Sequence, residues 1–173
     1  MKKLLTVAAL LVVAYATQAQ GTVNFNNKTG GVDSPVFDVG GTTKLAGPAF
    51  LAGLYEGDTL LGATAPFRTG TGAGYWNPAP DSSRATSVAP GANATLTVRA
   101  WEASGGANYA AALSAGKKTG KSDAVTVATG GAGSPPSLPA VLTGLKSFSL
   151  VPEPSTIALG ALGAAVLLFR RRK

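Results

Sequence analysis

Two apolar runs without a charged residue, near the ends of the chain, limit what the rest of it can fold into. Residues 4–16 form the first run and residues 157–169 form the second, and basic residues lie outside each of them. Neither run has the polar stripe of a helix that packs on the surface of a globular domain. Residues 20–151 therefore remain to fold as one domain, and they are numerous enough to enclose a hydrophobic core.

The N-terminal run has the layout of a secretory signal peptide. Lys2 and Lys3 form a basic start, an apolar stretch follows, and small residues come after it. We expect residues 1–19 to be this signal, with cleavage after Ala19 and Gln20 as the new N-terminus. The alternative is a buried N-terminal helix of a cytosolic domain, which the lack of a polar face disfavours.

The C-terminal run is predicted to form a short transmembrane helix. A helix over residues 157–169 spans roughly 20 Å, which is less than the ~30 Å of a hydrocarbon core, so the span is marginal. The basic residues after the run should stay in the cytoplasm, and the residues before Pro152 should therefore lie outside. A signal peptide requires the same orientation.

The residues around this run resemble the PEP-CTERM sorting signal of Gram-negative bacterial proteins. Residues 151–156 read Val-Pro-Glu-Pro-Ser-Thr, and a short apolar stretch and a terminal arginine run follow. The resemblance covers residues 151–173 and implies recognition by exosortase, a membrane transpeptidase-like enzyme, and an association with exopolysaccharide and biofilm. It assigns a recognition motif to Pro152, Glu153 and Pro154. It assigns a stop-transfer signal to Arg170, Arg171, Arg172 and Lys173. An ordinary C-terminal anchor that contains Pro-Glu-Pro is the alternative.

The segment between the two runs is predicted to be an all-β domain. Short apolar or alternating stretches, separated by glycine and proline, predict strands at residues 22–26, 49–55, 60–67, 95–101, 124–128 and 146–150. Residues 56–59 are expected to form a four-residue hairpin loop, residues 130–139 a loop or linker, and only residues 109–115 a helix. This pattern favours an antiparallel β-sandwich ectodomain.

Three aromatic residues are candidates for stacking on a sugar ring. The alternation in residues 95–101 places Trp101 on the face opposite Leu96, and an exposed Trp101 would give a flat platform for a glycan. Tyr75 and Trp76, in a glycine-rich loop, are the second candidate. The alternatives, which we favour, are that a bulge turns Trp101 inward or a loop or second sheet covers it, and that Tyr75 and Trp76 close one end of the sandwich.

The residue inventory excludes several kinds of catalytic site. The chain has no His and no Cys, so a Ser-His-Asp triad, a cysteine nucleophile and a His or Cys zinc site are absent. Residues 115–122 match a relaxed phosphate-loop pattern, but a strand pattern follows them where nucleotide binding needs a helix. No pair of acids is placed for glycoside hydrolysis by any local pattern.

Most of the net charge of +7 belongs to the two ends of the chain. Residues 20–151 keep nine basic and seven acidic residues, so the charge gives no reason to expect a nucleic-acid partner. The expected protein is a non-enzymatic exported surface or matrix protein without cofactor or metal. Its expected partners are signal peptidase, exosortase, the membrane and exopolysaccharide. A carbohydrate-binding module is the alternative, and a carboxylate-based glycan enzyme is a distant third.

Overall fold

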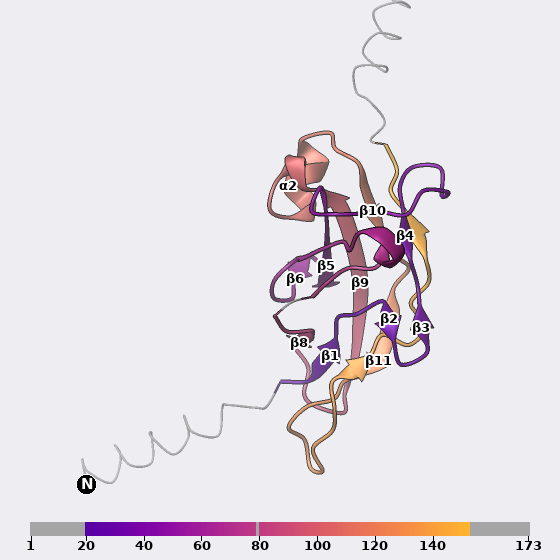
Figure 1. The fold of residues 1–173 in the computed structure, drawn as a ribbon. Helices are drawn as coiled ribbons and strands as arrows, with labels where there is room; N and C mark the ends of the chain where they lie inside the picture. The colour runs from indigo at the N-terminus through magenta and orange to yellow at the C-terminus, as the bar shows by residue number, and fades with distance from the viewer. Residues whose placement is uncertain (1–19, 79, 153–173) are drawn as a thin grey trace, which may run out of the picture.

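A six-stranded antiparallel sheet forms the centre of the computed structural model, which describes residues 20–78 and 80–152 (Figure 1). Its two long strands, β5 (Phe50–Glu56) and β9 (Asn93–Glu102), pair from Phe50 opposite Glu102 to Glu56 opposite Leu96. Along the other edge of β9 lie β10 (Thr119–Lys121) and β11 (Val125–Ala128). Along the other edge of β5 lie β6 (Thr59–Leu60) and β7 (Ala65–Pro66).

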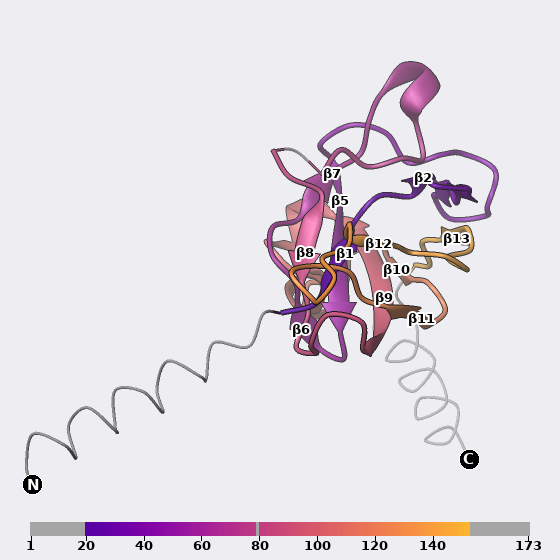
Figure 2. The ribbon, with the colours of Figure 1, turned by 90° about the horizontal axis from the view of Figure 1, so that it is seen from below.

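Three small sheets pack against one face of the large sheet. In the first, β1 (Thr22–Asn24) lies between β8 (Ser83–Ala85) and β12 (Ala140–Val141). In the second, β4 (Val36–Phe37) pairs with β13 (Phe148–Ser149), and in the third β2 (Lys28–Thr29) pairs with β3 (Val32–Asp33). Figure 2 shows β2 and β13 lying to the side of β5 and β9.

The main core lies between the large sheet and the small ones. The alternation along β9 directs Leu96, Val98 and Ala100 into it, as the sequence predicts, and Val23 of β1 and Val36 of β4 face them. Each of these side chains is buried. The burial of apolar surface from both layers is the main force that holds the small sheets in place.

A short helix covers the other face of the large sheet. α2 (Tyr109–Ser114) begins after Asn108, whose Oδ1 accepts a hydrogen bond of 2.9 Å from the Ala111 N–H. Together with the turn η2 (Ala103–Gly105), it packs over β9 and forms a second small core. A further turn, η1 (Gly70–Gly72), lies in the loop that leads to Tyr75 and Trp76.

The described residues confirm a mostly β architecture with few helices and correct several details of it. The predicted hairpin exists, but its loop is shorter than predicted, because Glu56 already pairs with Thr59. Gly57, with φ +58°, supplies the left-handed conformation that this tight turn requires. Residues 60–67 form β6 and β7 rather than one strand. The pairings of β1 with β12 and of β4 with β13 are parallel, so the prediction of a purely antiparallel sandwich is wrong in the small sheets.

Candidate functional site

The chain leaves the fold between two strands. β13 pairs with β4 on one side, and the N–H of Leu150 donates a 2.9 Å hydrogen bond to the Phe37 carbonyl. On the other side Val151 and Thr119 form an isolated antiparallel bridge, in which the Val151 N–H donates at 2.8 Å. Leu150 is buried, whereas Val151 and Pro152 are exposed. Strand pairing therefore holds the C-terminal segment up to Val151, and Pro152 is the first residue after it without such a pairing.

Trp101 is on the predicted face of β9 but is not exposed. It is fully buried in the second core, where its ring meets Tyr109 edge to face at 6.4 Å between centroids. Its Nε1–H donates a 3.1 Å hydrogen bond to the Gly106 carbonyl. The candidate role of Trp101 as a glycan platform is therefore contradicted, because η2 and α2 cover that face of the strand, and the favoured alternative of a covered Trp101 is confirmed.

Trp76 is also buried and serves the main core. Its ring stacks on Phe25 at 4.8 Å between centroids, and its Nε1–H donates to the Phe25 carbonyl at 3.1 Å. Asn27, also buried, donates to the carbonyls of Ser34 and Gly74 and accepts from the Trp76 N–H. Trp76 therefore closes the core, and a stacking role for it is excluded by its burial.

Tyr75 is half-buried and belongs to a charged surface cluster that the sequence pattern does not reveal. Its hydroxyl donates to Asp33 Oδ1 at 2.6 Å, and the Lys28 ammonium donates to Asp33 Oδ2. The ammonium groups of Lys28 and Lys44 lie 5.3 Å and 5.5 Å from the centroid of the Tyr75 ring. The hydrogen bonds from Lys28 and Tyr75 hold the pKa of Asp33 below its usual value, and the same bonds raise the pKa of Lys28 and of Tyr75.

Arg99 forms a second polar site, beside α2. Its Nη2 donates to the Gly57 carbonyl at 2.6 Å and to Asp58 Oδ1 at 2.9 Å, and its guanidinium carbon lies 4.3 Å from the centroid of the Tyr55 ring. Its Nε is buried and has no hydrogen-bond partner among the described residues. A pocket of about 300 Å³ is lined by Tyr55, Asp58, Leu60, Arg99, Asn108 and Ala110. The position of Arg99 two residues before Trp101, on the same face of β9, was a signal that sequence analysis did not use.

The segment that matches a phosphate-loop pattern contains a strand. Residues 119–121 form β10, which pairs with residues 99–101 of β9, and β11 follows it. Since no helix begins after the loop, its N–H groups cannot converge on a phosphate in the manner of that motif. Among the described residues no group of three acids is placed to hold a metal ion.

Comparison with known protein families identifies the segment that follows this exit. Residues 150–173 match the family model of the PEP-CTERM protein-sorting motif. The chain carries a PEP-CTERM sorting motif. The match begins at Leu150, inside the fold, so the PEP-CTERM motif continues from the last paired residues without a linker. No curated protein and no solved structure matches the chain.

The PEP-CTERM motif supports an exported protein that is targeted to exosortase and transiently anchored in the membrane at its C-terminus. Of the predicted recognition residues, only Pro152 is described, and it is exposed. Glu153, Pro154 and the basic residues 170–173 lie outside the described residues, as do Ala19 and the rest of the predicted signal peptide. Gln20 is exposed at the start of the fold.

Within residues 20–78 and 80–152, no helix has the length and apolarity needed to cross a membrane. The apolar runs at residues 4–16 and 157–169 lie outside these ranges, so the signal peptide and the C-terminal transmembrane helix stay predictions.

Proposed function

We propose that this chain is a non-enzymatic exported protein of the cell surface or extracellular matrix, which a signal peptide carries across the inner membrane and exosortase then processes. The match to the PEP-CTERM motif at residues 150–173 carries the proposal. Signal peptidase cuts after Ala19, and exosortase recognises Pro152, Glu153 and Pro154. The basic residues 170–173 stay in the cytoplasm until the tail is removed.

The limits of the fold support both processing steps. Gly21 is buried and its N–H donates to the Val88 carbonyl at 2.7 Å, so the core begins directly after the predicted signal cleavage. Val151 is the last paired residue at the other end. Removal of residues 1–19 and of the segment after Pro152 therefore takes no residue out of the described core.

The ion pairs of three of the seven acids in residues 20–151 support the absence of catalysis at those positions. A glycosidase of the common kind needs two carboxyl groups that face one substrate. Asp33 is bound by Lys28 and Tyr75, Asp38 by Lys118, and Asp58 by Arg99, so these carboxylates already neutralise local basic groups. Turnover of a glycan by the purified domain, abolished when two acids are removed, would overturn this part of the proposal.

A processing assay in an exosortase-containing Gram-negative host tests the proposal. Pro154→Ala should leave the full-length chain in the membrane fraction, because the recognition motif is broken. Pro136→Ala, in the exposed loop before β12, is the matched control and should be processed as the wild type is. Equal processing of the two variants would contradict a role for the PEP-CTERM motif.

A second candidate function, glycan binding, rests on the Arg99 pocket. The pocket offers a guanidinium, a carboxylate and an amide beside the apolar side chains of Leu60 and Ala110, which suits a hydroxyl-rich ligand. An association with exopolysaccharide would use this pocket instead of the buried tryptophans. Arg99→Met keeps an unbranched side chain over Tyr55 and removes the donors, so it should reduce retention of the domain on the exopolysaccharide of the host. Unchanged retention would exclude this pocket.

A further inference from the structure

Exposed hydrophobic side chains gather where the chain leaves the fold. The described residues leave four large hydrophobic side chains exposed: Val39 at 39%, Leu113 at 43%, Leu138 at 88% and Val151 at 57%. Val151 is the last paired residue. Val39 belongs to the loop after β4 and Leu113 to α2, and Figure 1 shows both elements at the end of the molecule where the chain leaves the fold. Leu138 belongs to the loop of residues 131–139, which Figure 1 shows at the opposite end of the molecule. We call Val39, Leu113, Lys117, Lys118 and Val151, with the backbone between them, the exit end.

Hydrogen bonds connect the segments that carry these residues. The Lys117 N–H donates to the Ala112 carbonyl at 3.0 Å, next to Leu113 in α2, and Thr119 bridges to Val151. The Lys118 ammonium donates to both oxygens of Asp38, at 3.0 Å and 2.9 Å, and the neighbouring Val39 N–H donates to Asp38 Oδ1. Residues 117–119 therefore link α2, the loop after β4 and Val151 at this end of the fold.

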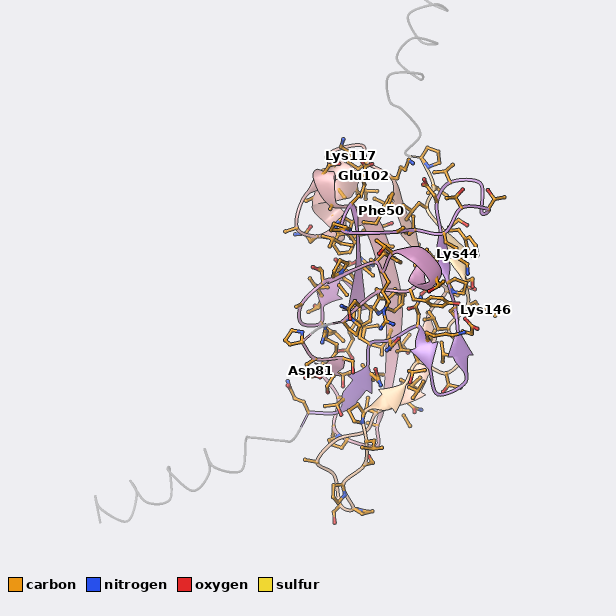
Figure 3. All side chains as sticks on the ribbon, viewed as in Figure 1. Lys44, Phe50, Asp81, Glu102, Lys117 and Lys146 are labelled. Atoms are coloured by element: carbon orange, nitrogen blue, oxygen red, sulfur yellow. The ribbon has the colours of Figure 1, made fainter. Side chains whose placement is uncertain are left out.

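Basic and acidic side chains lie together at the exit end. Lys118 is paired with Asp38, and Figure 3 shows Lys117 and Glu102 at the same end of the molecule. The Glu102 N–H also donates to the Lys118 carbonyl at 3.0 Å, which places β9 beside these lysines. Because both signs of charge are present, this surface is not a basic patch that would select an anionic partner. Its exposed apolar side chains are its distinguishing feature.

The length of chain between the fold and the apolar run limits how far the exit end can lie from the membrane. From Val151 to residue 157, where the apolar run begins, the backbone extends roughly 20 Å at most. While that run is in the membrane, Val151 stays within this distance of the lipid, and the other residues of the exit end lie at the same end of the fold. The loop around Leu138 lies at the far end and has no such constraint.

We propose that the exit end rests on the lipid surface while the C-terminal anchor is in place, with Val39, Leu113 and Val151 in contact with the acyl chains near the headgroups. This inference rests on the proposed function, because it needs the anchor. A short tether turns the contact into an intramolecular one, so a small apolar surface suffices. The same surface is too small to hold the released domain, which leaves the membrane once the tail is cut.

Contact quenching by brominated lipids tests the inference, and the chain suits it because it has no native Cys. Residues 20–173 are reconstituted in neutral phosphatidylcholine vesicles with bromine on the upper acyl chains, and a fluorophore is attached at Val39→Cys, Leu113→Cys or Leu138→Cys. The first two labels should be quenched at least twofold more than the third. Equal quenching at the three positions, or none at Val39 and Leu113, would overturn the inference.

Further measurements distinguish a failure of the lipid contact from a failure of the proposed function, and a lipid contact from a protein partner. Flotation with the vesicles reports the anchor alone: a chain that does not float contradicts the proposed function, whereas a floating chain without quenching contradicts only the lipid contact. Leu113→Asp should at least halve the quenching at position 39, and Leu138→Asp should leave it unchanged. Anionic lipid should change neither result. Quenching that requires added exosortase would show a protein partner and overturn the lipid contact.

Discussion

Gly120 of β10 and Ser149 of β13 approach so closely that a Cβ atom at Gly120 would lie 2.6 Å from the Ser149 carbonyl oxygen. The same Cβ would lie 3.1 Å from Leu150 Cα. Both obstacles are backbone atoms, which cannot rotate away as the end of a side chain can. A residue without a side chain is therefore needed for β10 to hold the segment from which the sorting motif continues.

Gly120→Ala should destabilise residues 20–152 by about 1–3 kcal/mol, because the added methyl group forces the exit segment away from β10. Urea denaturation followed by circular dichroism measures the change. Gly133→Ala is the control, since its Cβ would meet no atom closer than Pro90 Cβ at 3.2 Å, and it should cost less. Equal stabilities of Gly120→Ala and the wild type would show that the exit segment is not packed as described.

Trp76 and Trp101 should both be shielded from solvent, since each is fully buried. The native domain should therefore show blue-shifted tryptophan emission and weak quenching by acrylamide. Unfolding in urea should restore strong quenching. Strong quenching of the native domain would show that at least one tryptophan is exposed, and the stacking hypothesis would then stand again.

Local sequence patterns predicted the faces of the strands well but not what covers them. The period-two alternation correctly placed Leu96 and Trp101 on opposite faces of β9. Whether Trp101 meets solvent depends on η2 and α2, which follow β9 through a turn that alternation does not describe. The parallel pairings of β1 with β12 and β4 with β13 join residues more than a hundred positions apart, and no local pattern encodes such contacts. The ion pair of Lys28 and Asp33 depends in turn on the short β2–β3 hairpin, which was not predicted.

Asn27→Ala should destabilise the domain by at least about 2 kcal/mol, because the carbonyls of Ser34 and Gly74 and the N–H of Trp76 lose a buried partner. Asn93→Ala, at an exposed position at the start of β9, is the matched control and should change stability little. The two midpoints of urea denaturation give the comparison. Similar midpoints would contradict the buried network.

Asp33 should contribute to stability above its ordinary carboxyl pKa of 3.8, because the bonds from Lys28 and Tyr75 lower the pKa of the folded form. The contribution is lost as the pH falls through the folded pKa, since Asp33 is then protonated in both states. Asp33→Asn should therefore flatten the acid limb of stability against pH, by a small amount because the pair is exposed. Asp123→Asn is the control for an exposed acid. An acid limb identical to that of the wild type would contradict the effect of Asp33.

The intact mass of the mature protein tests the account most directly. Protein recovered from the surface or medium of an exosortase-containing host should begin at Gln20 and lack the terminal basic residues 170–173. This mass would show both processing steps at once and would leave the fold from Gly21 to Val151 whole. Surface material that still ends at Lys173 would contradict processing by exosortase, and material that still begins at Met1 would contradict the signal peptide.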